Sequence, residues 1–348
     1  GGTFASVGAL AAVLRAKRTG EGEHVDFSLL EVMNIASSNY MDLFWNLTGD
    51  PPAQGLPQSV ETPSVEPTSD GYVGFCTNTA QQFSDFLLLI ERPDLREDKQ
   101  LFQVVGRMAR FEEWCAIVKD YTRKHSTAEI IEKASLLRIP VAPVNDGQRV
   151  LEHEQLVARG VFFQHPGADF QRPRPPYRLN FELPPLPRPA PALGEHTGSI
   201  EPAPAASRES DASAKSGLPL EGVRILDMTA WWAGPSAAHV LACLGADVIH
   251  LESIQRPDGM RMAGGAFFDK PEWWERSAFF LAANTNKRGI TVDLTRPEGV
   301  QVVEKLVAGC DVLLENFTPR VMDNFGLTWP RLQRLNPQLI FLRMPAFG

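Results

Sequence analysis

The sequence contains few cysteines and no long apolar run. Its four cysteines, Cys76, Cys115, Cys243 and Cys310, lie far apart, and no two of them form a CxxC pair. This spacing argues against a disulfide framework and a cysteine-based zinc site, and it is typical of free thiols in a reducing compartment. No stretch reaches the length of a membrane-spanning helix, and no signal peptide is recognisable. We therefore expect a cytoplasmic protein with no membrane partner.

Positive charge is also scarce. The chain carries 34 Lys and Arg against 42 Asp and Glu, a formal net charge of −8. A general nucleic-acid binder needs clustered cations, so the composition argues against nucleic acid as a partner. It leaves room for one basic pocket that binds a phosphorylated small molecule. The 348 residues, 43% of them hydrophobic, are enough for two domains with their own cores.

The common signatures of catalysis are missing. No Ser/His/Asp arrangement stands out, and His24, His196, His239 and His250 are scattered in contexts where a structural role is the default. Metal-ligand spacing is absent, so we expect no metal. No GxGxxG motif follows a strand, which makes a dinucleotide site a weak hypothesis.

The first 50 residues predict a helix, a strand and a second helix. In GGTFASVGALAAVLRAKRTGEG, apolar residues recur at helical spacing, and Gly20 and Gly22 end the helix. EHVDFSLLEV then predicts a strand at His24–Phe27. A helix follows from Ser28, where Glu31 three residues on forms a capping box.

Residues 51–181 predict a small α/β unit. SDGYVGFC contains a turn at Asp70-Gly71 and a strand at Tyr72–Cys76, and the helical stretches QQFSDFLLLI, RFEEWCAIVKDYT and TAEIIEKASLL follow. Residues 182–217 are rich in Pro, Ala and Ser with almost no large apolar side chain. Such a segment cannot bury enough surface to offset its ordering entropy, so it predicts a linker.

Residues 218–348 alternate between short apolar strands and helices, with Pro297 and Glu298 opening one of the helices. This alternation predicts an α/β fold with a doubly wound, Rossmann-like parallel sheet. In such sheets ligands bind at the carboxyl ends of the strands. The predicted strands are Val223–Thr229, Asp247–Glu252, Gly289–Leu294, Asp311–Phe317 and Leu339–Met344.

Three stretches beside these strand ends could bind a ligand. The loop TAWWAGP, residues 229–235, follows the first strand, where helix N-terminal amides can hold a phosphate, although its two tryptophans could equally pack. Lys287 and Arg288 could pair with phosphates, but an ordinary solvated pair is the simpler interpretation. Asn316 and Phe317 could bind a ring or a ribose, although a cap and a core aromatic would look the same.

These stretches resemble a known family. PLEGVRILDMTAWWAGPSAAHVLACLGADVIHLE and NTNKRGITVDLTRPEGVQVVEKLVAGCDVLLENF are similar to the N-terminal signature of the class III CoA-transferases, which include formyl-CoA and carnitine CoA-transferases and α-methylacyl-CoA racemases. The first half of the chain, with SDGYVGFCTN, ERPDL, RIPVAPVND, PYRL and LGEHT, resembles the later part of the same family. The family order is therefore inverted.

The resemblance implies the middle fragment of a tandem two-copy fusion, with a circular permutation as the alternative. Residues 1–50 would end the large domain of copy 1, 51–181 would be its small domain, 182–217 its tail and the linker, and 218–348 the N-terminal CoA-binding part of copy 2. The start at Gly1-Gly2 and the stop at Phe347-Gly348 suit a fragment. We expect residues 218–348 to pack against 1–50.

The family moves CoA between an acyl-CoA thioester and a carboxylic acid through an aspartyl-acyl anhydride. Its nucleophilic Asp would lie about three residues before Gly1, within alignment error. The chain would therefore lack the catalytic Asp. Asp26 and Asp227 both occupy predicted strand positions, so we assign a catalytic role to neither. The substrates implied are coenzyme A, as acyl-CoA, and a carboxylate. Family members form interlocked homodimers, which a tandem chain could mimic as an intrachain pseudo-dimer.

The resemblance also implies CoA contacts, residue by residue. They are Trp232, Ala233, Val292, Asp293, Leu294, Thr295, Asn316, Phe317, Thr318 and Asn324. At two positions that are often basic in the family, this chain has Ser253 and Asn324 instead of a cation. Arg256, Arg261 and Arg296 are possible substitutes.

Three alternatives stay open. A racemase would need a Glu near residues 76–83, and that stretch has no carboxylate, which favours transfer. A CoA-linked lyase is another, since tandem copies occur in dimethylsulfoniopropionate-cleaving members of the family. A non-catalytic CoA-binding half is the third.

Overall fold

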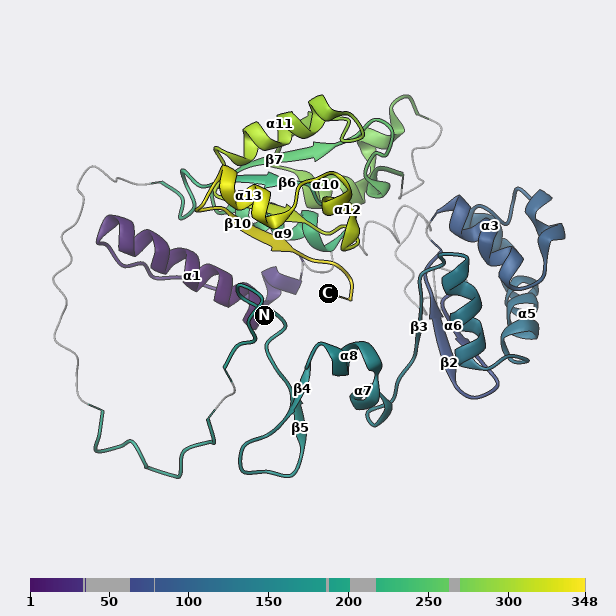
Figure 1. Cartoon of the computed structure of the whole chain (residues 1–348), viewed down its shortest axis with the longest axis horizontal. Coiled ribbons are helices and arrows are strands. Elements are labelled where there is room, and N and C mark those ends of the chain that lie inside the picture. Colours follow the sequence, from purple (N-terminus) through teal and green to yellow (C-terminus); the bar gives the residue numbers. More distant parts are fainter. Residues whose placement is uncertain are drawn as a thin grey trace. The chain divides into compact units, whose positions relative to one another are not determined.

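The computed structural model describes residues 1–33, 35, 63–77, 79–185, 188–200, 217–262 and 270–347, without the side chains of Val104 and Val105. The chain divides into two compact units (Figure 1). Unit 1 comprises Gly1–Pro52 and Ser199–Gly348, and unit 2 comprises Ala53–Gly198.

Unit 1 begins with the predicted helix, α1 (Gly2–Thr19). Gly20 ends it in the left-handed conformation, with φ 77°, and its N–H donates to the carbonyl oxygen of Ala16. The strand predicted at His24–Phe27 is wrong, because residues 21–28 have no regular structure. An alternating pattern forms a strand only where a neighbour satisfies the backbone, and no strand of the described part of the chain pairs with this segment.

Residues 29–33 are helical, and the Ser28 hydroxyl accepts the N–H of Glu31 as expected for a cap. Helix α1 contacts the start of the second part of unit 1. The Arg15 side chain donates to the Gly217 carbonyl over 3.2 Å, and that of Arg18 donates to the Glu221 carbonyl over 2.8 Å. The contact expected between residues 1–50 and 218–348 is therefore present.

Unit 2 contains an antiparallel sheet of β1 (Val65–Pro67), β2 (Tyr72–Phe75) and β3 (Val141–Pro143), with β2 in the centre. Around it lie α3 (Ala80–Leu89), η1 (Pro93–Glu97), α4 (Val104–Ala109), α5 (Phe111–Thr122) and α6 (Thr127–Leu136). Capping boxes at Thr79 and Ser126 open α3 and α6. The core is apolar and aromatic, with Phe83, Phe86, Leu87 and Trp114 all at most 2% exposed.

The rest of unit 2 is less regular. It holds α7 (Arg149–Glu152), α8 (Glu154–Ala158) and the antiparallel pair β4 (Phe162–Gln164) and β5 (Gln171–Pro173). Residues 183–185 and 188–200 of the predicted linker contain neither helix nor strand. Residues 201–216 of that linker lie outside the described residues.

Unit 1 is built on a five-stranded parallel sheet, which confirms the predicted parallel α/β arrangement (Figure 1). The strand order is β10-β9-β6-β7-β8, so the chain runs from the centre to one edge and then returns to build the other. Each observed strand overlaps its predicted range. The strands are β6 (Arg224–Asp227), β7 (Asp247–Glu252), β8 (Arg288–Thr291), β9 (Val312–Glu315) and β10 (Ile340–Arg343).

Helices join these strands, and neighbouring strand residues pack into different cores. Leu226 and Leu313 pack with α11 (Pro297–Val307) and α13 (Trp329–Leu335), whereas Ile225 and Leu314 pack with α9 (Ala233–Cys243). Because successive side chains of a strand point to opposite faces, both faces are buried, as parallel strands require. Shorter elements complete the unit: η2 (Gly259–Met262), η4 (Trp273–Arg276), α10 (Ala278–Asn284) and α12 (Arg320–Asn324).

Candidate ligand site at the carboxyl edge of the parallel sheet

The loop after β6 lies where the strand order reverses. β6 pairs with β7 on one side and β9 on the other, so the loops that follow β6 and β9 leave the sheet side by side. In open α/β sheets the crevice at this point is the usual ligand site. Side chains at the strand ends hold the loop: the N–H of Thr229 donates to Asp227 Oδ1 over 3.0 Å.

Asn316 joins the loop after β9 to the loop after β6. Its Oδ1 accepts the Ala230 N–H over 2.9 Å, and its Nδ2 donates to the Ala230 carbonyl over 2.7 Å. The amide therefore grips one residue of the neighbouring loop from both sides. The Asn316 side chain, expected to contact CoA, is engaged in positioning that loop.

Trp231 follows in a backbone conformation that large side chains rarely adopt, with φ 66°. Its N–H donates to Asp258 Oδ1 over 2.9 Å, and the same oxygen accepts the Met260 N–H over 3.0 Å. The Trp231 indole lies against Gly259, where a Cβ would overlap the ring. Asp258 and Gly259 thus fix a strained residue, and such strain is often found at functional sites.

A cluster of buried ionisable groups lies at the ends of the strands. Asp227 is fully buried, with Oδ2 3.1 Å from His250 Nδ1 and 2.9 Å from Lys287 Nζ. Burial by itself would raise the pKa of Asp227, but the His250 hydrogen bond and the charges of His250 and Lys287 outweigh it and lower the pKa to about 2. Lys287 also donates to the Pro235 carbonyl and to Asn284 Oδ1.

The interpretation of Lys287 as part of a solvated pair is wrong, and its role in phosphate binding stays a prediction. Its side chain is 1% exposed and makes three hydrogen bonds within the protein. Burial lowers its pKa, although the Asp227 charge acts in the opposite direction. Its neighbour Arg288 is exposed and pairs with Asp247 over 2.6 Å.

Two buried polar atoms near this cluster have no hydrogen-bond partner among the described residues: His250 Nε2 and Asp258 Oδ2. Burial raises the pKa of Asp258, against two backbone N–H groups that favour its charged form. Nearby, Arg261 pairs with Glu252 over 2.6 Å and lies 3.6 Å from the centre of the Phe280 ring. Arg261, a possible substitute for a family cation, is therefore already paired.

The two tryptophans of the loop keep part of their surface in solvent. Trp231 is 39% exposed and Trp232 is 38% exposed. The Trp232 ring packs at an angle against Phe279 of α10, with centroids 5.5 Å apart. Trp232 and Ala233, both expected to contact CoA, lie at the start of α9.

The other expected CoA contacts follow β9 and β8. Phe317 donates its N–H to Glu315 and packs against the core, and Thr318 lies next to it. Asn324 ends α12, which follows this loop. Glu315, fully buried, pairs with Arg343 over 2.6 Å.

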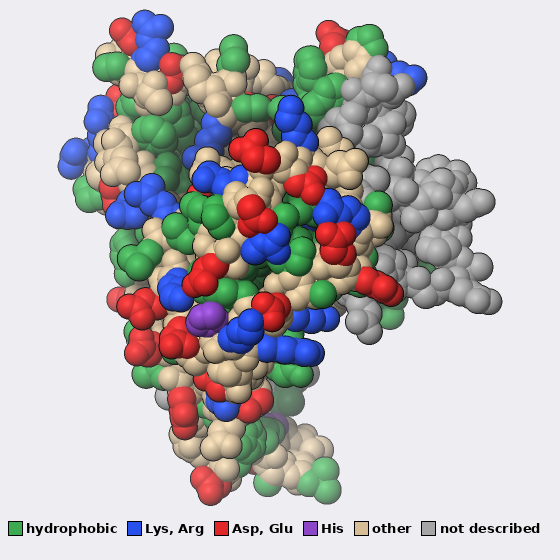
Figure 2. Space-filling view, turned by 90° about the vertical axis from the view of Figure 1, so that its right-hand side faces the viewer, with side chains coloured by type: hydrophobic (Ala, Val, Ile, Leu, Met, Phe, Trp, Pro, Cys, Tyr) green, Lys and Arg blue, Asp and Glu red, His purple; other side chains and the backbone are tan. Residues whose placement is uncertain are grey.

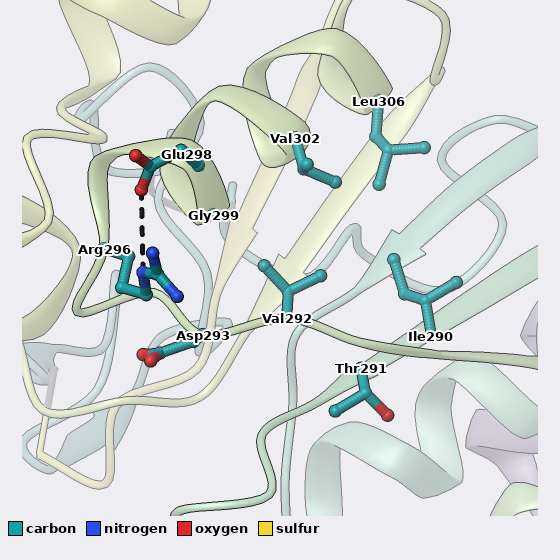
Figure 3. A pocket seen from close by; sticks show the side chains of 9 residues that line it. All are labelled: Ile290, Thr291, Val292, Asp293, Arg296, Glu298, Gly299, Val302 and Leu306. Carbon is teal, nitrogen blue, oxygen red and sulfur yellow. Dashed lines mark ion pairs between the residues drawn. The ribbon is translucent and has the colours of Figure 1, made fainter.

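A shallow pocket of about 520 Å³ lies beside β8 (Figure 3). Apolar side chains gather along one part of it and the Arg296–Glu298 ion pair lies at the other. Asp293 is held by the Thr295 hydroxyl and N–H, and these hydrogen bonds lower its pKa. The pocket is lined by Ile290, Thr291, Val292, Asp293, Arg296, Glu298, Gly299, Val302 and Leu306.

The expected site residues therefore fall in two places. Trp232, Ala233 and Asn316 belong to the neighbouring segments after β6 and β9, which Asn316 joins at Ala230, whereas Val292–Thr295 follow β8 at the edge of the sheet. The loop after β7 reaches the second place, since Gln255 donates to Asp293 over 3.1 Å.

Sequence reasoning did not identify His250 and Asp258 as site residues. Both lie at the first of these two locations, beside the loop after β6. The signal for His250 was a polar residue within the apolar strand DVIHLE. Asp258, in RPDGM, looks like an ordinary turn residue.

Charged patches, metal sites and membrane-spanning helices could mark other functional surfaces in the described part of the chain. Acidic and basic side chains are interspersed on the face shown in Figure 2. Within the described ranges, no three His, Cys, Asp or Glu side chains lie close enough to hold a metal ion. No helix in those ranges has both the length and the apolar character needed to cross a bilayer.

Comparison with known proteins shows to which family the chain belongs. The family model described as CoA-transferase family III matches residues 1–197 and 220–348. A probable CoA-transferase, Rv1866 of Mycobacterium tuberculosis, is 26% identical over 97% of this chain and 43% of its own length. A formyl-CoA:oxalate CoA-transferase of Rhodopseudomonas palustris is 43% identical over 37% of this chain and 29% of its own length. The chain thus spans less than half of these relatives.

Among solved structures, Rv3272 of M. tuberculosis is 35% identical over 38% of this chain and 34% of its own, with a TM-score of 0.34. A CaiB/BaiF family protein of Brucella suis is 37% identical over 37% of this chain and 33% of its own, also with a TM-score of 0.34. The family model covers most of the sequence in two stretches. The chain belongs to CoA-transferase family III.

Proposed function

We propose that this chain is part of an enzyme that moves CoA between an acyl-CoA thioester and a carboxylic acid. The observation that carries the proposal is the match to CoA-transferase family III on both sides of the linker. The clamped loop at the sheet reversal supports it, because a parallel sheet binds its ligand at that edge. Cytoplasmic location stays a prediction.

In the proposed reaction an enzyme carboxylate attacks the thioester carbonyl carbon. The C–S bond breaks, CoA leaves as a thiolate, and a mixed anhydride forms. The thiolate then attacks the enzyme carbonyl of the anhydride, the donor carboxylate leaves, and CoA is held as an enzyme thioester. The acceptor carboxylate attacks this thioester, which releases the thiolate and forms an anhydride between acceptor and enzyme. The thiolate attacks the acceptor carbonyl, which gives the new thioester and restores the enzyme carboxylate. By resemblance the attacking Asp lies outside residues 1–348, so this chain contributes the CoA-binding elements.

Within those elements, Trp232, Ala233 and the residues after β9 would contact CoA at the crevice. Val292, Asp293, Leu294 and Thr295 would line the adenine and phosphate region. Asp227 and Asn316 would hold the loop in place before CoA arrives, which lowers the entropy cost of binding.

We also infer the tandem arrangement and the doubly wound sheet. The alignment with Rv1866 follows 97% of this chain while covering only 43% of that protein, which supports the inverted order as part of a longer chain. The strand order and the helices packed on both faces support the winding. Unit 2 would be the small domain.

An interlocked dimer or an intrachain pseudo-dimer is proposed on one further feature. Helix α1 and the helical residues 29–33 expose large apolar side chains that a partner copy would cover. They are Leu10, Val13, Leu14, Leu29, Leu30 and Met33, all at least 47% exposed.

The proposal is tested by titrating the chain with CoA in a calorimeter and by mixing it with an acyl-CoA and an isotope-labelled carboxylate. We expect CoA binding without turnover by residues 1–348, and label transfer into the CoA pool by the protein that carries the flanking Asp. Exchange of the α-hydrogen without transfer would instead establish a racemase. Absence of CoA binding would contradict the proposal.

A further inference from the structure

The loop after β6 has little backbone left with which to bind an anion. The N–H groups of three consecutive residues, Thr229, Ala230 and Trp231, each donate to a side chain of the protein itself. Loops that cradle phosphates do so with unengaged N–H groups that converge on the ligand. Residues 229–231 therefore have no N–H group left for a phosphate, and Trp231 is the largest side chain that they present.

Three cations close to the loop are also engaged. Lys287 is bonded to Asp227, Arg261 pairs with Glu252 and Glu275, and Arg343 pairs with Glu315. Each positive charge is balanced by a carboxylate, so the region offers little attraction to the phosphates of CoA or to a small dianionic acid.

What the loop presents is aromatic. Trp231 and Trp232 are each more than a third exposed although they belong to a tightly held segment. The Trp231 N–H is held by Asp258, and its indole lies against Gly259, where no Cβ interferes. The Trp232 ring packs against Phe279. Rigid indoles give a large apolar contact at a low entropy cost, because few torsions have to be frozen on binding.

We propose that Trp231 and Trp232 form the seat of a bulky apolar acyl group, aromatic or of medium chain length, in the thioester substrate. This inference rests on the proposed function, since it assigns the acyl part of the same ligand. It separates the chain from its relative named formyl-CoA:oxalate CoA-transferase, whose name specifies small polar acids. The diphosphate of CoA would lie away from the indoles, towards the residues after β8.

The test is calorimetric titration of residues 1–348 with CoA, acetyl-CoA and benzoyl-CoA. Stacking on an indole is worth enough for benzoyl-CoA to bind about tenfold more tightly than CoA, with acetyl-CoA close to CoA. Trp232→Ala should reduce the ratio of the benzoyl-CoA and CoA affinities to about one, and Trp232→Phe should restore most of it. Trp329→Phe, a change in a tryptophan stacked on Phe341, is the matched control and should leave the ratio unchanged.

Each result has one meaning. If the three ligands bind the unchanged chain with equal affinity, the acyl seat is wrong while the proposed function stands. If benzoyl-CoA binds more tightly but Trp232→Ala keeps the full ratio, the acyl group is seated elsewhere and the inference fails. If none of the three binds, the proposed function itself fails. A circular dichroism melt of each variant separates loss of the acyl contact from loss of folding.

Discussion

Both compact units have apolar cores, and they differ in the charged groups buried beside those cores. The core of unit 2 is apolar, with Phe83, Phe86 and Trp114 packed ring against ring. The centre of unit 1, at the end of its strands, buries Asp227 and Lys287 together with His250. Apolar burial stabilises a fold directly. In a buried ion pair the cost of removing both charges from water offsets most of their attraction, so the net stabilisation is small. The comparison suggests that unit 2 is built for stability and that the buried charges of unit 1 position a site.

The largest effect is expected from breaking the buried pair. Lys287→Met removes the ammonium partner of the buried Asp227 carboxylate and leaves it only His250 and Thr229, which should cost about 3 kcal/mol of unfolding free energy. It also removes the hydrogen bonds to Pro235 and Asn284, so CoA binding should weaken in the molecules that remain folded. Urea unfolding and calorimetry measure the two effects.

The double variant Asp227→Asn with Lys287→Met is the control for that experiment. Removing both charges should recover part of the stability, because no unpaired charge remains. If the single and double variants are equally unstable, the pair does not act as a unit and the contrast between the two interiors is lost.

A cavity in unit 2 should affect stability alone. Leu87 is fully buried in the aromatic core, and Leu87→Ala should cost about 2–5 kcal/mol. CoA affinity, measured by calorimetry well below the midpoint of thermal unfolding, should stay within about twofold of the unchanged chain, since the core around Leu87 contains none of the expected CoA contacts. A larger loss of affinity would place unit 2 in the CoA site.

The loop clamp should affect binding more than stability. Asn316→Leu removes the acceptor of the Ala230 N–H and the donor to its carbonyl, at a cost of about 1–3 kcal/mol. We expect a loss of CoA affinity larger than that caused by Leu87→Ala, together with a change in the fluorescence of Trp231 and Trp232. Unchanged fluorescence and affinity would show that the loop keeps its conformation without the clamp.

The smallest effect is expected in acid. Because the folded pKa of Asp227, about 2, lies below its ordinary value of 3.8, its ionised form stabilises the fold at neutral pH. That contribution, roughly 2 kcal/mol, is lost as the pH falls from about 4 to 2. Asp258 acts in the opposite sense, since burial raises its pKa and its ionisation becomes a cost as the pH rises.

Urea unfolding between pH 2.5 and 7 checks both signs. Asp227→Asn should flatten the acid limb of the stability curve, and Asp258→Asn should hold or raise stability at neutral pH while Asn keeps an oxygen to accept the Trp231 N–H. If stability falls as steeply at low pH in Asp227→Asn as in the unchanged chain, the loss of stability in acid comes from other carboxylates.

Local pattern predicted the sheet well. Apolar runs such as DVIHLE, bounded by turn residues and alternating with helices, indicate parallel strands, and β7 has the predicted bounds Asp247–Glu252. The same reasoning failed at His24–Phe27, because a strand needs a partner that a local pattern does not supply.

The site was only partly predictable for the same reason. The loop 229–235 could be placed because it follows the first strand of an α/β repeat. The partners of that loop lie far along the chain: Asn316 is 86 positions from Ala230, and Lys287 is 60 positions from Asp227. Lys287 beside Arg288 looks like a solvated pair until the fold buries one of the two.

The central claim is that the clamped loop of unit 1 belongs to the ligand site. Hydrogen–deuterium exchange of the chain with and without saturating CoA tests it most directly. We predict slower exchange in residues 229–236, 292–295 and 316–319, and unchanged exchange in the core helices α3 and α5 of unit 2. Protection confined to unit 2, or no protection by CoA anywhere, would contradict the account.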